Sequence, residues 1–179
     1  MTKKNLVKIL VLCLIVAIIA GIYLFKNPPA TTQAPEDSTA PEDTDFTLTA
    51  TEAIDFETLA EHGLPIIVDY GSDSCVPCQQ MAPVLKTMNE EMTGKAFIKF
   101  VDVWEYAEAA SNVPVQVIPT QVIVNADGTP FVPSVELAQQ IDFILYNSRE
   151  TGEHVFTVHQ GGLTEEQMRL ILTEMGVEA

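Results

Sequence analysis

The sequence is poor in residues that hold metal ions. Its 179 residues include three cysteines and three histidines. A structural zinc site takes four ligands, and the cysteine outside the pair at positions 75 and 78 is Cys13, in an apolar N-terminal segment. His154 and His159 stand five positions apart in a strand-like stretch and point to opposite faces, while His62 stands alone in a turn. We therefore predict no metal site, and no ligand set for a copper-handling protein.

Basic residues are also scarce. Nine lysines and arginines stand against twenty-five aspartates and glutamates, and the net charge is −16. Four of the nine basic residues occur before residue 27, so the rest of the chain is still more acidic. Such a charge repels nucleic acid and anionic lipid headgroups. We expect no nucleic-acid partner.

One long apolar run lies near the N-terminus. It extends from Ile9 to Phe25, and a helix of this length spans roughly 25 Å at about 1.5 Å per residue. Three lysines precede the run and Lys26 follows it, so the positive-inside rule places the following residues outside the cytoplasm. No small-residue cleavage motif stands out after it. We expect residues 1–26 to be a membrane anchor or signal, and we favour the uncleaved anchor.

The remaining chain divides into a linker and one domain. Residues 27–45 are rich in proline, threonine, alanine and acidic residues and have no apolar periodicity, which predicts a flexible tether. Residues 46–179 suffice for a single core. We expect this domain to be monomeric.

Strand-like and helix-like stretches alternate in the domain. Five apolar residues at helical spacing predict a helix that contains Pro83 and reaches a turn at Gly94, and Thr164 with Gln167 forms a capping box for the last helix. The order predicts an α/β fold with a central mixed sheet flanked by helices. The predicted strands are residues 66–70, 97–103, 120–125 and 155–159, and further short helices are predicted at residues 55–61 and 105–111.

Cys75 and Cys78 stand where a strand-like run gives way to a helical one. The first turn of a helix brings positions i and i+3 to one face, so the two thiols can close as a disulfide. Unpaired backbone N–H groups and the positive end of the helix dipole favour the thiolate of Cys75, which makes it the nucleophile. A ring this short restrains little unfolded chain, so a purely stabilising role is the poorer explanation. The pair predicts thiol–disulfide redox chemistry.

Several separate marks make residues 55–176 resemble the thioredoxin family. The resemblance implies the thioredoxin fold and an exchange reaction that needs no cofactor beyond the dithiol itself. The marks are the Cys75–Cys78 pair after a strand, Asp69 six residues before Cys75, Pro83 five residues after Cys78, Ile118-Pro119-Thr120 entering a strand, the Asp127-Gly128 turn, and Gly161 before the last helix.

The resemblance also implies a role for each site residue. Cys75, exposed at the helix start, would attack the substrate, and Cys78 would release the mixed disulfide. Asp69 would be a buried carboxylate with a raised pKa that takes a proton from the Cys78 thiol. Pro119 would follow a cis peptide bond and present the backbone of Ile118 to the substrate.

The sequence departs from the family around the cysteines. Gly71 and Ser74 stand where the family has tryptophans, the one tryptophan is Trp104, and Val76 replaces a glycine. We expect a more polar and more open surface around Cys75.

The chain is also longer than the family pattern, and residues 129–153 resemble an insertion. Residues 135–146 alternate between polar and apolar side chains and are followed by a turn-like segment, which predicts an added strand beside the last one. The predicted fold therefore carries a β-type insertion, either a decoration or a recognition element.

Together these features predict a membrane-anchored, extracytoplasmic thiol–disulfide oxidoreductase. Asp69 and Ile118 resemble their counterparts in reducing relatives, so we favour a reductase of disulfide-containing extracytoplasmic proteins. The same resemblance implies a CcdA-like membrane electron donor. The alternatives are an oxidase that forms disulfides and a binding module without catalysis.

Overall fold

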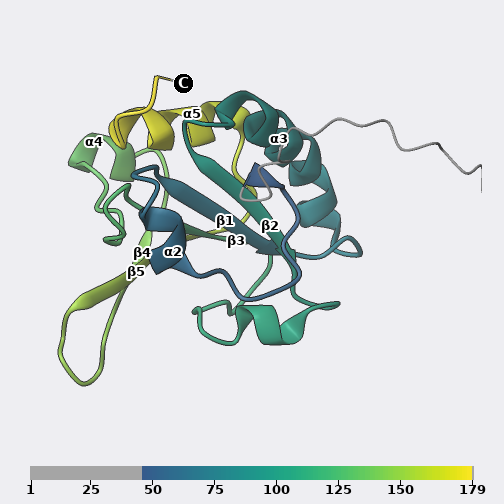
Figure 1. Ribbon diagram of the computed structural model, residues 1–179, viewed down its shortest axis with the longest axis horizontal. Coiled ribbons are helices and arrows are strands. Elements are labelled where there is room, and N and C mark those ends of the chain that lie inside the picture. Colours follow the sequence, from purple (N-terminus) through teal and green to yellow (C-terminus); the bar gives the residue numbers. More distant parts are fainter. Residues whose placement is uncertain (1–45, 179) are drawn as a thin grey trace, which may run out of the picture. The chain divides into compact units, whose positions relative to one another are not determined.

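The computed structural model describes residues 46–178 (Figure 1). The expected anchor at residues 1–26, with Cys13, and the expected linker at residues 27–45 lie outside this part of the chain. Among the helices of residues 46–178, none has the length and hydropathy that a membrane span requires. The elements are α2 (Phe56–Ala60), β1 (Ile66–Gly71), α3 (Val76–Met92), β2 (Phe97–Asp102), η2 (Ala107–Ala110), β3 (Thr120–Val124), α4 (Val135–Ala138), β4 (Ile144–Asn147), β5 (His154–Gln160) and α5 (Glu165–Glu174).

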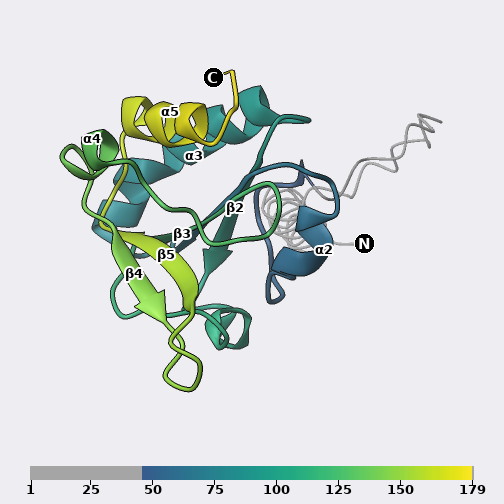
Figure 2. The same ribbon diagram turned by 90° about the vertical axis from the view of Figure 1, so that its left-hand side faces the viewer.

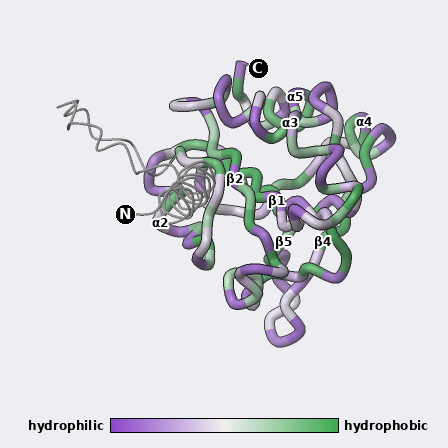
Figure 3. The backbone as a smooth tube through the Cα atoms, turned by 90° about the vertical axis from the view of Figure 1, so that its right-hand side faces the viewer, coloured by the Kyte–Doolittle hydropathy of each residue, from purple (hydrophilic) through white to green (hydrophobic). Residues whose placement is uncertain are grey.

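The strands form one mixed sheet in the order β2-β1-β3-β5-β4. The β1–β2 pair is parallel and the other pairs are antiparallel. Figures 1 and 2 show α3 and α5 on one face of the sheet and α2 on the other. Figure 3 shows β1 and β2 as mainly hydrophobic stretches in the middle of the domain. The predicted α/β fold with a central mixed sheet is confirmed.

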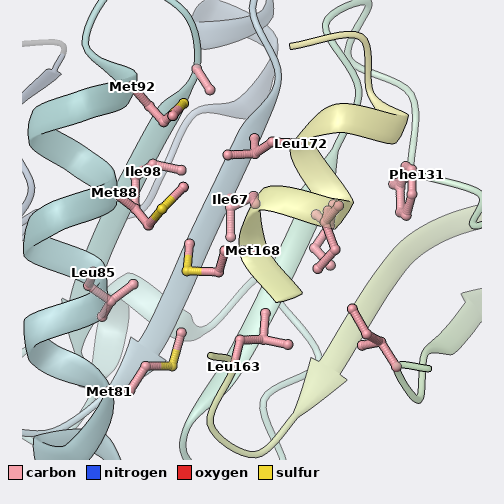
Figure 4. Packing of buried hydrophobic residues seen from close by; sticks show 14 of the residues in the cluster. Ile67, Met81, Leu85, Met88, Met92, Ile98, Phe131, Leu163, Met168 and Leu172 are labelled. Atoms are coloured by element: carbon pink, nitrogen blue, oxygen red, sulfur yellow. The ribbon is translucent and has the colours of Figure 1, made fainter. Parts of the chain in front are cut away.

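The apolar stripe predicted for α3 faces the sheet. Its buried residues interdigitate with β1, β2 and α5 (Figure 4), and this packing removes their apolar surface from water. Pro83 lies inside the helix, and the Thr164–Gln167 capping box begins α5, both as predicted. The buried residues of α3 are Cys78, Met81, Leu85, Met88 and Met92.

The strand register brings four loops to one edge of the sheet. Gly71 pairs with Asp102, so the parallel strands β1 and β2 end together (Figure 1). Tyr70 pairs with Thr120 and Thr120 with Gln160, so β3 begins and β5 ends at that same edge. The loops after β1, β2 and β5 and the loop before β3 therefore meet there. We call this edge the dithiol edge.

The insertion differs in part from the prediction. β4 pairs with β5 at the outer side of the sheet, which confirms an added strand beside the last one, but it covers only Ile144–Asn147. Residues 135–138, predicted as part of that strand, are helical instead. The Ser134 hydroxyl caps this turn by accepting a hydrogen bond from the N–H of Leu137, and Leu137 is buried in the core. A capped turn with one buried residue outweighs the local alternation.

Candidate active site

Cys75 is placed by the turn that joins β1 to α3. It is the N-cap residue of α3, with extended backbone angles, and its N–H donates to the carbonyl of Ser72 at 3.1 Å. Pro77 sits in the first helical turn, where a missing N–H costs no intrahelical hydrogen bond. The Cys75 Sγ lies 3.9 Å from the carbonyl oxygen of Ile118. The thiol thus lies between the start of α3 and the segment that enters β3.

The two cysteines are both free thiols and both lie beneath the surface. Cys75 exposes 8% of its surface and Cys78 exposes 4%. The expectation of an exposed Cys75 is therefore wrong, because the segment around Ile118 covers it. Burial, and then the neighbouring Cys75 thiol, raise the pKa of Cys78 to about 12. Cys78 must therefore lose its proton to a base before it can attack.

Asp69 lies in the middle of β1 and is fully buried. It faces Gln121 across the β1–β3 pair, and Gln121 Nε2 donates to Asp69 Oδ1 at 2.5 Å. Burial raises the pKa of Asp69 to about 7, and the hydrogen bond from Gln121 opposes this rise. The carboxyl can therefore exchange a proton near neutral pH.

Gly71 keeps a gap between this carboxyl and the second thiol. A Cβ at position 71 would lie 3.1 Å from Asp69 Oδ2, 3.3 Å from Cys78 Sγ and 3.0 Å from the Phe100 ring. Within residues 46–178, Asp69 Oδ2 has no hydrogen-bond partner. The oxygen that could take a proton and the sulfur that must lose one therefore adjoin the same gap. A larger residue at position 71 would fill it.

Gln121 was not anticipated from the sequence. The signal for it is weak, because it is one polar residue at the start of the apolar run that forms β3. It is fully buried, and its Nε2 also approaches the Met81 sulfur at 3.4 Å. Its side-chain oxygen has no hydrogen-bond partner within residues 46–178.

Asp102 was also missed, and it links two loops of the dithiol edge. Its Oδ2 accepts from the N–H of Asp73 at 2.9 Å. Its Oδ1 accepts from the N–H groups of Trp104 at 2.9 Å and Glu105 at 3.2 Å. Burial opposes ionisation, but these backbone donors together outweigh it and lower the pKa of Asp102. The turn that carries Cys75 is thus held by an ionised carboxylate from β2.

The Ile118–Pro119 peptide bond is cis, as the resemblance implies. The Pro119 carbonyl accepts from the N–H of Gly161 at 2.9 Å, and the Thr120 hydroxyl donates to the Val117 carbonyl at 2.7 Å. These bonds hold residues 117–119 beside Cys75. The structure therefore brings Cys75, Cys78, Asp69, Ile118 and Pro119 to one place.

The histidines lie elsewhere. His62 packs edge-on against Phe97, while His154 and His159 lie on β5 and contact the backbone carbonyls of Phe156 and Asp142. Within residues 46–178, no three His, Cys, Asp or Glu side chains are arranged as a metal-binding set.

Several known proteins are similar to this chain in sequence or in structure. A family model described as Thioredoxin matches residues 47–142. Thioredoxin of Staphylococcus aureus (strain Mu50 / ATCC 700699) is 37% identical over 94 residues, which are 49% of this chain and 88% of that protein. Fasciola hepatica thioredoxin is similar in structure with 25% identity and a TM-score of 0.48, covering 72% of this chain and 99% of that one. Thioredoxin NaTrxh from Nicotiana alata has 21% identity and a TM-score of 0.47, covering 70% and 90%.

Proposed function

Because the chain belongs to the thioredoxin family, with its fold and its thiol–disulfide oxidoreductase activity, we propose that it works outside the cytoplasm as a reductase of protein disulfides. Cys75 and Cys78 supply the electrons, and Asp69 is the proton acceptor. Ile118 and Pro119 form the side of the site against which the substrate backbone lies. The observation that carries this proposal is that the buried Cys78 thiol lies beside the buried Asp69 carboxyl. The thiol is costly to deprotonate, and the carboxyl can take its proton.

The reaction takes two exchange steps. The Cys75 thiolate attacks one sulfur of the substrate disulfide, whose S–S bond breaks while a mixed disulfide forms and the first substrate thiolate leaves. Asp69 then accepts the proton of Cys78, and the Cys78 sulfur attacks Cys75. The Cys75–Cys78 disulfide forms as the second substrate sulfur leaves. The dithiol loses two electrons and two protons, and the substrate gains both.

The charges near the dithiol support the reducing direction. A strong oxidase of this kind stabilises its reduced form as a thiolate. Within residues 46–178, no lysine, arginine or histidine occurs in the turn that carries the cysteines, while Asp69, Asp73 and Asp102 surround it. Burial disfavours the thiolate of Cys78 further. The reduced form thus gains little electrostatic stabilisation, which favours giving electrons away.

A redox equilibrium tests the direction. The domain is equilibrated with mixtures of reduced and oxidised glutathione, and the fraction of Cys75–Cys78 disulfide is measured by thiol alkylation. We expect a potential nearer to about −270 mV, as for thioredoxin, than to about −120 mV, as for a strong oxidase. A value at the oxidising end would reverse the proposed direction. A domain that leaves an insulin-like disulfide intact in the presence of reductant would be a binding module instead.

The extracytoplasmic location rests on the N-terminal sequence. The apolar run from Ile9 to Phe25 with three lysines before it supports an anchor whose following residues lie outside. The electrons would then come from a CcdA-like membrane donor, and the substrates would be disulfide-containing extracytoplasmic proteins. Protease added to intact cells should digest the domain, while the chain stays in the membrane fraction. A domain that resists protease until the cells are lysed would contradict this location.

A further inference from the structure

Three exposed apolar side chains lie on three segments that meet at the dithiol edge: the start of α3, the loop after β2 and the loop before β3. They make this edge more apolar than the replacement of the two tryptophans led us to expect. Val76 follows Cys75, Val117 precedes Ile118, and Trp104 lies two residues after the end of β2. All three are exposed, and Trp104 exposes 64% of its surface. We call Val76, Trp104 and Val117 the apolar rim. Large exposed apolar side chains gathered around a reactive thiol are typical of a surface that binds another molecule.

Trp104 is tied to the turn that carries Cys75. The Asp102 carboxylate accepts hydrogen bonds from the N–H of Trp104 and from the N–H of Asp73, both at 2.9 Å. Asp73 lies two residues before Cys75. Positions 71 and 74, where the family has tryptophans, hold glycine and serine in this chain. The single tryptophan, Trp104, instead reaches the dithiol edge on the loop that follows the neighbouring strand β2.

A pocket opens between α3 and the loop that follows β2, next to Cys78. It has a volume of about 340 Å³. Its apolar wall includes Leu48 and Phe100, and the acidic residues Asp73, Asp102 and Glu105 line it as well. This combination suits the side chain of lysine or arginine, whose alkyl stem packs on apolar surface while its charged end contacts carboxylates.

Charge at the dithiol edge is of one sign. Asp73 and Glu105 are exposed there, and no basic residue occurs in residues 71–79 or 103–119. The ion pairs found within residues 46–178 join residues of α3 and α5 instead: Lys86 with Glu90, and Arg169 with Glu91 and Glu165. These ion pairs include neither Asp73 nor Glu105, so a partner of opposite charge can approach these two exposed carboxylates.

We propose that the apolar rim and the adjacent pocket dock a cationic segment of the substrate protein, with a lysine or arginine close to the disulfide that Cys75 attacks. This inference rests on the proposed function, because it specifies the substrate class of the same site. Attraction between the segment and the acidic edge raises the rate of productive encounter at low salt. The apolar rim then contributes contact area that salt does not screen.

Matched peptides test the substrate class. Two disulfide-bonded peptides are prepared that differ only in having lysine or glutamate beside the cysteines, and kcat/KM is measured with the full chain at low and high salt. We expect the lysine peptide to react about tenfold faster at low salt, with the ratio falling toward one as salt screens the charges. Equal rates at low salt would overturn the inference.

Variants assign the preference to this edge. Glu105→Gln should reduce the ratio between the peptides, and Trp104→Ala should lower kcat/KM for both. Glu57→Gln is the matched control, because Glu57 is exposed on α2, which precedes β1 and lies away from the dithiol edge. An equal loss of preference in Glu57→Gln would show a general effect of net charge and overturn the assignment to this edge.

A binding measurement separates this inference from the proposed function. Peptides with serine in place of cysteine cannot exchange, and their binding is followed by the fluorescence of Trp104, the single tryptophan. Tighter binding of the lysine analogue supports docking even if exchange fails, in which case the proposed reductase function is wrong. Equal affinity of the two analogues overturns the docking inference even if both disulfide peptides are reduced.

Discussion

The central strand β1 and the outer strand β4 of one sheet differ in burial and in the contacts that they make. Every residue of β1 is buried, and Asp69 on this strand contacts the neighbouring strand β3 through Gln121. β4, at the outer edge, is largely exposed and, among the strands of residues 46–178, pairs only with β5 (Figure 2). A side-chain hydrogen bond of 3.1 Å from Gln116 to the Tyr146 hydroxyl connects β4 with the segment before Ile118.

This difference shows what each region can tolerate. A buried carboxyl with a pKa near neutrality needs burial on all sides and one hydrogen-bond donor, so its neighbours are tightly constrained. An edge strand has one paired side and can change its exposed side chains without disturbing the core. The first part of the insertion does not share this freedom, because Phe131, Leu137 and Ile141 are buried in the core.

The largest effect is expected at the cysteines. Cys75→Ser should abolish exchange, whereas Cys78→Ser should trap mixed disulfides with substrates, because the first thiol attacks and the second releases. Thiol-trapping gels and multiple-turnover assays measure this. If both single variants behave alike, or if Cys78→Ser turns over normally, the two roles are wrongly assigned.

The next largest effect, on stability, is expected at a buried residue of the insertion. Leu137→Ala should lower the free energy of unfolding by about 2–5 kcal/mol, because it leaves a cavity where a buried side chain packed. Urea denaturation measures the change, and Val135→Ala is the control on the same short helix, since Val135 is exposed. Equal stability of both variants would place the whole insertion outside the core.

The proton acceptor is the next test. Asp69→Asn should slow the resolving step by a factor on the order of 10² near pH 8 and leave the attack by Cys75 nearly unchanged. Below its pKa of about 7 the wild-type carboxyl is protonated and cannot accept, and near pH 12 Cys78 ionises without help, so the effect should shrink at both ends. Stopped-flow measurement of both steps checks this. Equal slowing at every pH would leave Asp69 a structural role.

Gln121 should have a smaller effect of defined sign. Its hydrogen bond lowers the pKa of Asp69 against the effect of burial, so Gln121→Leu should raise that pKa. The rise of the resolving rate with pH should then shift to higher pH, with a severalfold loss at pH 7. Gln140→Leu, on the segment after α4, is the control, because Gln140 is exposed. An unshifted pH profile would contradict the role of Gln121.

The smallest effect on the chemistry is expected at β4. Replacing Ile144 and Leu145 by threonine should leave reduction of a small disulfide unchanged, since both side chains are exposed on the edge strand. Exchange with the natural partner should weaken if β4 and β5 contribute to recognition. A double variant that folds but cannot reduce a small disulfide would show that β4 belongs to the active site.

Local patterns in the sequence determined much of this protein. The spacing of Cys75 and Cys78, the apolar face of α3 and the capping box of α5 depend on residues a few positions apart, so periodicity and propensity suffice to predict them. The resemblance added Asp69 and the cis bond before Pro119, both of which the structure places beside the thiols.

Only the tertiary structure decided which distant residues complete the site. Gln121 meets Asp69 because of the β1–β3 register, and Asp102 reaches the turn before Cys75 because β1 and β2 end together. Residues 135–138 are helical because Leu137 finds room in the core. Pairing register and burial depend on contacts between segments that are far apart in the chain, and no local pattern contains that information.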